Sequence, residues 1–485
     1  MIRLRRNRRS LAACLLAATL SAVVSPVWAD CGRAPTDPAA VTAQSLLDAL
    51  VGLNGVPGMG AAVWRDGELA WTGCAGWRDL QAQQPVRADT VFRFASVSKA
   101  IAATAAAKLA EQGKLDLDAP LQARLPWLPA AWAPMTLRQV AAHVAGLPHY
   151  QAGDQGIGRD GRRYASQREA VGVFAGRALL SAPGSRYHYS SYGYTLVGAA
   201  VEDAAGEPFL DYLGRAIVPG LSIDAEQGGR GERESQLYEL EGGAAHRVER
   251  PRNHSYSWGG GGLAGTPESL ARFGGRLMSG QILEPASFAA LQQPLRFDDG
   301  RPVRERDYRL GLGWRLGTDL DGARIVHHAG ITEGARAALV LWPQRAIAAS
   351  VASNAEWVSS IESTTMMLAA PFQPLPAGLP TAACPLAQRR YRGRLGEQAL
   401  GGAIRFRLER GRCVGELEAD AVLRAHFAKA SAWTRPRLQA IALDAGGGLA
   451  RAALVTPFGL YDLRAQGDGR YLAQLSGDKL LELRL

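Results

Sequence analysis

Short apolar runs near residues 60 and 340 predict strands, and a longer apolar stretch between them predicts a buried helix. Residues 57–80 are expected to form a β-hairpin, because two such runs flank Asp66-Gly67, a dipeptide that favours a tight turn. A second hairpin is expected between 337 and 352. From Ser96 an alanine-rich stretch is apolar on nearly every side, which predicts a buried helix that ends near Gly113.

Between these two predicted hairpins, the spacing of apolar residues mainly predicts helices. Further helices are expected at 136–144, 168–180, 193–204 and 266–279. Strands on both sides of a helical middle predict an α+β fold, in which the two ends meet in one antiparallel sheet with flanking helices.

The pattern changes after residue 370. Residues 371–385 contain five prolines, which predicts a linker. Apolar and polar residues then alternate through 386–485, which predicts a small all-β domain, either a barrel or a sandwich. A chain of 485 residues is expected to hold two folded units, here 30–370 and 386–485.

Residues 1–29 have the order of a secretory signal peptide: arginines, an apolar run, and then Val27-Trp28-Ala29. Cleavage after Ala29 would place the protein in the periplasm or outside the cell. The alternative is a membrane anchor, but the apolar run is short and interrupted, so no stable membrane span is expected after cleavage. Loss of five arginines would lower the net charge from +10 to +5, and no nucleic-acid partner is expected from so mild an excess.

Four cysteines remain after this cleavage, at positions 31, 74, 384 and 413. An exported protein favours disulfides over free thiols, and no Cys-x-x-Cys pair indicates zinc. Of the three possible connectivities, proximity within a domain favours Cys31 with Cys74 and Cys384 with Cys413.

Ser96 and Lys99 are the first candidates for chemistry. A serine hydroxyl needs a base to become a good nucleophile, and a lysine can act as that base when burial lowers its pKa. The two residues stand three apart at the start of the buried helix, so their side chains share one face. The chain has only five lysines against fifty arginines. A lysine kept at this buried position therefore favours a catalytic pair, since arginine could not act as a base there.

Several motifs occur in a fixed order over residues 45–365: Phe94-Ala95-Ser96-Val97-Ser98-Lys99, His143 to Pro148, Pro183-Gly184 through Tyr189-Ser190-Ser191, Gly261-Gly262-Leu263, Leu310 to Trp314, and His328-Ala329-Gly330. In this conjunction the chain resembles the serine β-lactamase and penicillin-binding-protein superfamily, especially its class C-like branch with esterases and D-amino-acid peptidases. The resemblance implies the β-lactamase/transpeptidase-like antiparallel sheet with flanking helices and a helical subdomain.

The resemblance also implies roles for individual residues. Tyr189 would be the family's catalytic tyrosine, sharing protons with Lys99 and passing one to the leaving group; the alternative is an aromatic residue at the edge of a strand. The backbone N–H groups of Ser96 and Ile331 would form the oxyanion hole. Ser191, His328, Gly330 and Ile331 are the expected substrate-binding positions.

Two departures from the family pattern bear on the substrate. Ser191 stands where the tyrosine motif usually ends in asparagine, and His328-Ala329-Gly330 replaces Lys-Thr-Gly, which offers a cation and a hydroxyl to a substrate carboxylate. β-Lactam hydrolysis is therefore less expected than esterase or D-peptidase activity. His328 could bind substrate or assist proton transfer, or it could be a packed strand residue.

Other motifs favour structural interpretations. His327 is expected on the opposite face of its strand from His328, and His143 is expected to be a hydrogen-bonded structural residue. The histidines lack the spaced partners of a zinc site, so no metal is expected. Gly260-x-Gly262-x-x-Gly265 follows a polar segment, so close backbone approach explains it better than dinucleotide binding.

Together these features predict a secreted serine hydrolase that forms an acyl-enzyme, needs no cofactor, and acts on a small ester, a peptide with D-residues or a β-lactam. The alternatives are a sensor or scaffold that does not turn over, and a surface-binding module led by the C-terminal domain. The sequence leaves the native substrate and the oligomeric state open.

Overall fold

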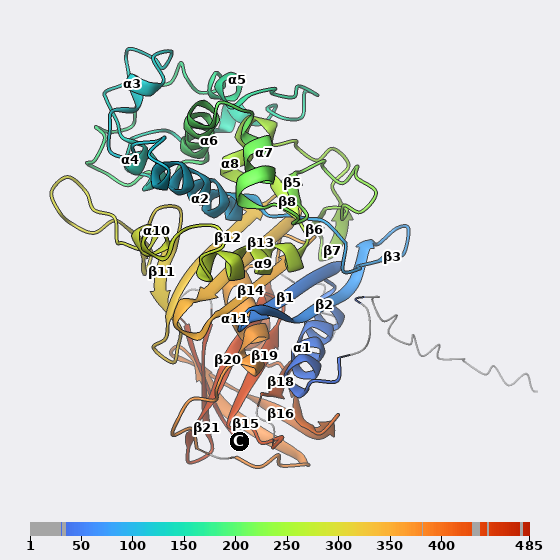
Figure 1. Ribbon diagram of the computed structural model, residues 1–485. Coiled ribbons are helices and arrows are strands. Elements are labelled where there is room, and N and C mark those ends of the chain that lie inside the picture. Colours follow the sequence, from blue (N-terminus) through green and yellow to red (C-terminus); the bar gives the residue numbers. More distant parts are fainter. Residues whose placement is uncertain (1–30, 32–34, 381, 429–436, 444–445, 476–478) are drawn as a thin grey trace, which may run out of the picture.

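The computed structural model describes residues 31, 35–380, 382–428, 437–443, 446–475 and 479–485 (Figure 1). The predicted signal peptide, residues 1–29, lies outside the described residues. Within these described ranges, no helix is both long enough and apolar enough to cross a bilayer.

A nine-stranded sheet forms the centre of the larger domain, in the order β3-β2-β1-β14-β13-β12-β11-β10-β9. Its strands are β1 (Gly58–Arg65), β2 (Glu68–Asp79), β3 (Gln84–Pro85), β9 (Arg304–Glu305), β10 (Tyr308–Leu310), β11 (Arg315–Thr318), β12 (Arg324–Thr332), β13 (Ala335–Trp342) and β14 (Ile347–Ser353). β1 pairs antiparallel with β14, from Met59 opposite Ser353 to Arg65 opposite Ile347. The expected meeting of the two ends in one antiparallel sheet is confirmed.

The hairpin predicted at 57–80 is β1 and β2, and its turn is the predicted dipeptide. Asp66 and Gly67 have φ angles of 52° and 94°. Both lie in the left-handed region that tight hairpin turns require, and aspartate and glycine tolerate it well.

Helices cover both faces of the sheet (Figure 1). On one side lie α1 (Pro38–Asn54) and α11 (Ile361–Ala369), and on the other lie α2 (Ser98–Glu111) and α9 (Pro267–Met278). The strands alternate accordingly, because successive side chains point to opposite faces. On β1, Ala61 and Val63 belong to the core under α1, whereas Ala62 and Trp64 belong to the core under α9.

A helical subdomain packs on the outer side of α2. It contains α3 (Leu121–Arg124), α4 (Leu137–Ala141), α5 (Gln167–Val171), α6 (Ser191–Ala205), α7 (Phe209–Tyr212) and α8 (Trp258–Gly261), while α10 (Pro285–Leu291) lies nearer the sheet. The helix predicted at 168–180 is wrong beyond its first turn. Gly172 and Gly176 interrupt the segment, and glycine in a helix interior costs about 1 kcal/mol relative to alanine.

The C-terminal domain is a closed barrel, not a sandwich. Its strands are β15 (Gln388–Leu395), β16 (Gln398–Glu409), β17 (Arg412–Glu418), β18 (Arg437–Ala442), β19 (Arg451–Thr456), β20 (Gly459–Gly467), β21 (Arg470–Leu475) and β22 (Lys479–Arg484), with α12 (Ala421–His426) after β17. Apolar side chains from all eight strands, together with Leu423 of α12, fill its interior.

The barrel packs against the α1 and α11 side of the sheet. Ile441, Val455 and Leu460 of the barrel belong to the same apolar core as α1 and α11. The Ser363 hydroxyl of α11 donates to the Leu460 carbonyl at 2.7 Å, and Asp321 pairs with Arg464 at 2.6 Å. A shared apolar core and polar contacts therefore fix the barrel to the larger domain.

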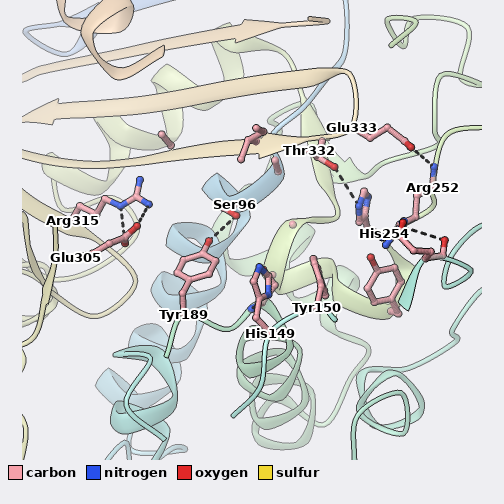
Figure 2. Close-up of a pocket in the computed structure, with 18 of the residues that line it drawn as sticks. Ser96, His149, Tyr150, Tyr189, Arg252, His254, Glu305, Arg315, Thr332 and Glu333 are labelled. Carbon is pink, nitrogen blue, oxygen red and sulfur yellow. Dashed lines mark hydrogen bonds and ion pairs between the residues drawn. The ribbon is translucent and has the colours of Figure 1, made fainter. Parts of the chain in front are cut away.

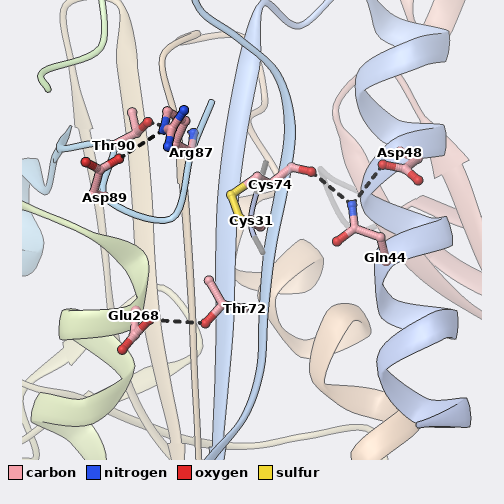
Figure 3. The surroundings of a disulfide bond; sticks show 9 residues. All are labelled: Cys31, Gln44, Asp48, Thr72, Cys74, Arg87, Asp89, Thr90 and Glu268. Atoms are coloured by element: carbon pink, nitrogen blue, oxygen red, sulfur yellow. Dashed lines mark hydrogen bonds and ion pairs between the residues drawn. A yellow bond between two sulfur atoms is a disulfide. The ribbon is translucent and has the colours of Figure 1, made fainter. Parts of the chain in front are cut away.

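Both predicted disulfides are present. Cys31 is bonded to Cys74 of β2, with a Cα–Cα distance of 5.6 Å, and Cys384 is bonded to Cys413 of β17, at 5.4 Å. Figure 3 shows the first bond beside α1, where the Gln44 amide donates to the Cys74 carbonyl at 2.9 Å. The pairing is compatible with an oxidising compartment.

Candidate active site

Ser96 lies in a single 3₁₀ turn, Ala95–Val97, that leads directly into α2. The turn directly follows a small three-stranded sheet, which consists of β4 (Phe92–Arg93), β8 (Leu263–Gly265) and β5 (Ile223–Ala225). Ala95 has a φ of 47°, a left-handed conformation that strains any residue with a side chain. Such strain persists where the surrounding structure imposes it, and here it places Ser96 at the wall of a pocket.

Lys99 lies one helical turn beyond Ser96, and its side chain is fully buried. Its Nζ is 3.1 Å from Ser96 Oγ and 2.9 Å from Ser191 Oγ, and it also contacts the Gly260 carbonyl. Burial lowers the pKa of Lys99 well below its ordinary value, and the nearby Arg315 guanidinium lowers it further. The amine is therefore favoured in its neutral form.

Tyr189 reaches Ser96 from the segment just before α6. Its hydroxyl donates to Ser96 Oγ at 2.8 Å, and its ring centroid lies 4.9 Å from Lys99 Nζ (Figure 2). Burial raises the pKa of Tyr189 to about 12, so the phenol keeps its proton at neutral pH. Of the two groups that contact the serine oxygen, the lysine is suited to accept a proton and the tyrosine to donate one.

Two histidines support this tyrosine. His143 Nδ1 accepts the Ser190 backbone N–H at 3.1 Å, and its ring lies 4.5 Å from the Tyr189 ring. This contact agrees with the structural role expected for His143. His149 Nδ1 accepts the Ser191 N–H at 3.3 Å, and its ring edge packs on Tyr189. His149 directly follows the motif that ends at Pro148, but it is not among the predicted site residues.

Gly330 allows the end of β12 to lie against the nucleophile turn. A Cβ atom at this position would be 2.3 Å from the Phe94 carbonyl oxygen and 2.7 Å from the Ser96 nitrogen. Only glycine permits so close an approach. The next residue, Ile331, is 55% exposed and lines the pocket. The strand therefore brings the predicted Ser96 and Ile331 segments together.

His328 is buried beneath the site and does not line the pocket, which Ala329, Ile331 and Thr332 line instead. Its Nδ1 lies 2.8 Å from the Ala329 carbonyl oxygen, which can only accept, so Nδ1 carries a proton. Burial and Arg315 lower the pKa of His328 well below its ordinary value. The ring is thus neutral, and its role in substrate binding stays a prediction.

The pocket has a volume of about 520 Å³ and two charged ends (Figure 2). At one end, Arg315 makes two hydrogen bonds to Glu305, at 2.7 and 3.1 Å. The other end holds Arg252, His254 and Glu333, whose carboxylate accepts the Arg252 backbone N–H at 2.9 Å. None of these residues was predicted, because each belongs to a loop or strand far from Ser96 in the sequence. In the described ranges, no three His, Cys, Asp or Glu side chains are grouped to hold a metal.

A buried ionic network lies directly behind the nucleophile turn. Arg93 and Glu226 are each 1% exposed and form an ion pair at 2.7 Å. Glu226 also accepts the backbone N–H and Nδ1 of His254, both at 2.8 Å, and His254 Nε2 lies 3.4 Å from Thr332 Oγ1. Burial would raise the pKa of Glu226, but Arg93 and His254 outweigh it and lower that pKa. The network therefore connects β4, the short strand just before the nucleophile turn, to the end of β12.

Glu226→Gln should destabilise the protein by about 3–5 kcal/mol, because it leaves the Arg93 guanidinium buried without its counter-ion. The free energy of unfolding in denaturant measures this loss, and Glu232→Gln, at an exposed position nearby, is the control. A Glu226 variant as stable as the control would show that the pair does not hold this region.

A family model described as Beta-lactamase matches residues 43–358. The chain belongs to this family. The match covers all the strands of the large sheet and leaves out the barrel. The β-lactamase fold explains why Ser96, Lys99 and Tyr189 meet at the junction of the sheet and the helical subdomain.

Similar proteins extend the comparison. The mitochondrial serine beta-lactamase-like protein LACTB of Homo sapiens is 25% identical over 311 residues, covering 49% of this chain and 56% of that protein. Esterase EstB of Burkholderia gladioli is 32% identical over 177 residues, covering 34% of this chain and 45% of that protein. The chain therefore spans about half the length of the curated relatives it matches.

One solved structure shows that the fold likeness reaches beyond the β-lactamase region. The octameric penicillin-binding protein homologue from Pyrococcus abyssi has a TM-score of 0.56 and 17% identity, and the superposition covers 90% of this chain and 99% of that one. At this identity the likeness concerns the fold alone.

Proposed function

We propose that this protein is a secreted serine hydrolase that cleaves an ester or amide through an acyl-enzyme on Ser96. The observation that carries the proposal is that Lys99 Nζ and Tyr189 Oη lie 3.1 and 2.8 Å from the same oxygen, Ser96 Oγ. Relatives named as an esterase, a D-alanyl-D-alanine-carboxypeptidase/endopeptidase and a D-aminopeptidase support hydrolysis of such bonds. The two disulfides support export.

In the acylation step, neutral Lys99 takes the proton of Ser96 while Oγ attacks the substrate carbonyl carbon. A neutral amine has two N–H groups and one lone pair. The N–H groups point to the Gly260 carbonyl and Ser191 Oγ, which leaves the lone pair for the serine proton. The carbonyl electron pair moves to oxygen, which the N–H groups of Ser96 and Ile331 are proposed to stabilise.

Collapse of this intermediate breaks the bond to the leaving group. The leaving atom takes the Tyr189 proton, and protonated Lys99 restores it to the tyrosine. Water then attacks the acyl carbon and gives up a proton to Lys99 through Tyr189. Ser96 Oγ departs and regains its proton, which releases a carboxylic acid and restores the free site.

The proposed substrates are simple esters and D-amino-acid amides or peptides, ahead of β-lactams. Ala329 offers no hydroxyl and buried His328 no cation where the related Lys-Thr-Gly motif would hold a drug carboxylate. Carboxylate recognition by that strand is therefore weakened.

A substrate panel tests the proposal. The purified protein and its Ser96→Ala variant would be assayed with p-nitrophenyl esters of short acids, D-alanine amide, a D-Ala-D-Ala peptide and a chromogenic cephalosporin. We expect Ser96-dependent turnover of an ester or a D-substrate, and slower turnover of the cephalosporin. Absence of turnover across the panel would contradict the hydrolase proposal, and a cephalosporin as the best substrate would contradict the proposed specificity.

Tyr189→Phe should lower kcat/KM for an amide by about 10²- to 10³-fold, because the phenol that protonates the leaving amine is lost. An ester whose leaving group departs as a stable phenolate needs no such proton and should lose far less. Tyr187→Phe removes a neighbouring buried hydroxyl and is the control. Equal losses for amide and ester, or for the two variants, would argue against proton delivery by Tyr189.

A further inference from the structure

The net positive charge of residues 30–485 lies in the C-terminal barrel domain. Residues 386–485 contain 15 arginines and two lysines against ten acidic residues, a net charge of +7, whereas residues 30–385 carry −2. The basic character belongs to the C-terminal domain and not to the protein as a whole.

Part of this charge forms a continuous surface, here called the basic face: Arg390, Arg392 and Arg394 of β15, Arg484 of β22 and Arg470 of β21. The three arginines of β15 alternate with the inward-facing Tyr391 and Leu395 and are exposed. Arg392 is paired in register with Arg484, and Arg484 with Arg470. Like charges directly opposite one another destabilise a sheet, so this arrangement costs the fold stability.

Acidic side chains neutralise the basic face only in part. Arg394 pairs with Glu482 at 3.1 Å, and Asp468 lies 3.0 Å from Arg470 and 4.0 Å from Arg484. Among the described residues, Arg390 and Arg392 have no acidic partner within ion-pair distance.

The neighbouring strand leaves these guanidinium groups uncovered. The β16 residues opposite the three arginines of β15 are Ala403, Gly401 and Ala399, so no long side chain stands directly opposite them on that strand. A flat or gently curved partner could therefore approach the whole row.

The basic face points away from the catalytic domain. β15 and β22 lie across the closed barrel from β18 and β19, whose Ile441 and Val455 pack in the core shared with α1 and α11. In Figure 1, β15 and β21 are at the end of the molecule opposite α2, the helix that follows Ser96. A partner bound to the basic face would leave the pocket open.

We propose that the basic face binds a membrane surface rich in anionic phospholipids. Guanidinium groups pair well with phosphate oxygens, and an array spread over three adjacent strands matches many head groups better than one extended polymer. The exposed Leu480 lies on the outer side of β22, two residues from Glu482, where it can enter the head-group layer. No aromatic side chain points outward from the described parts of β15, β21 and β22, so the stacking that single-stranded nucleic acids require is missing.

Vesicle sedimentation tests this binding with the whole purified protein. Phosphatidylglycerol-rich vesicles would be compared with phosphatidylcholine vesicles at low and high salt. The test variant replaces Arg390, Arg392 and Arg484 with glutamine. The control replaces Arg163, Arg233 and Arg247, three exposed arginines of the larger domain, and so changes the net charge equally.

The expected result is salt-sensitive binding to the anionic vesicles, weakened about 100-fold in the barrel variant and unchanged in the control. Equal weakening of both variants, equal binding to both kinds of vesicle, or no binding at low salt would overturn the proposal. So would tighter binding to single-stranded DNA that is lost in the same variant, since the face would then serve nucleic acid. Ester turnover in solution should be equal in all three proteins, which separates this proposal from the hydrolase proposal.

Discussion

Ser96→Ala is expected to lower kcat for the best substrate by about 10⁴- to 10⁶-fold. The hydroxyl oxygen is the atom that both Lys99 and Tyr189 contact, so its loss leaves these two groups without a nucleophile between them. Among the described residues, the hydrogen bonds of the Ser96 hydroxyl join it to those two side chains, so its loss should leave the packing of α2 unchanged. The protein should therefore fold normally, with a midpoint of thermal unfolding close to that of the parent.

Ser98→Ala is the matched control for this change. Ser98 is the first residue of α2, two positions beyond Ser96, but its hydroxyl accepts the Leu263 backbone N–H at 3.1 Å and faces the core. This variant should lose some stability and keep its turnover. If Ser96→Ala retained more than about a hundredth of the parent rate, another nucleophile would have to carry the reaction.

Lys99→Arg should be nearly as damaging, with a loss of about 10⁴-fold or more in kcat/KM. Arginine keeps a positive charge under all ordinary conditions, so it cannot accept the serine proton, and its longer side chain does not fit the fully buried site. Lys108→Arg, on the same helix but paired with Glu111 near the surface, should behave like the parent. A Lys99→Arg enzyme with parental activity would exclude the lysine as the base.

The assignment of Lys99 as the base also determines how kcat/KM depends on pH. Since the neutral amine is the active form, kcat/KM should fall as pH drops through the lowered pKa of Lys99, and it should be constant above it. The pKa of about 12 for Tyr189 places its deprotonation beyond the range of an ordinary assay, so no alkaline decline from this residue is expected. A decline between pH 8 and about 10 would indicate that Lys99 works in its charged form.

The sequence predicted the framework of the fold because its signals are local. Alternation around Asp66-Gly67, the alanine-rich run after Ser96 and the alternating C-terminal pattern each specify their own element. The closure of the C-terminal strands into a barrel was left open, since closure depends on β15 pairing with β22, across most of the domain. The helix expected at 168–180 ends at Val171, because Gly172 and Gly176 lower the helix propensity of the segment that follows.

The reacting groups were likewise predictable, whereas their surroundings were not. Ser96, Lys99 and Tyr189 stand in ordered motifs, and the structure brings all three to one oxygen. The Arg93–Glu226 ion pair joins two segments that are far apart in the sequence and share no motif. One sequence alone does not show that two such residues meet in the core. The same holds for Arg315 and Glu305, which meet only when β9 and β11 enter the sheet.

The site at which a fluorophosphonate attaches to the protein tests most directly whether Ser96 is the nucleophile. Attack by a serine oxygen expels fluoride and leaves a stable phosphonyl group, and trypsin would release the modified residue within the six-residue peptide Phe94–Lys99. Fragmentation of that peptide in a mass spectrometer distinguishes Ser96 from Ser98. We predict one adduct per chain, on Ser96, and none in Ser96→Ala. An adduct on any other residue, or ester turnover by a protein that forms no adduct, would contradict this prediction.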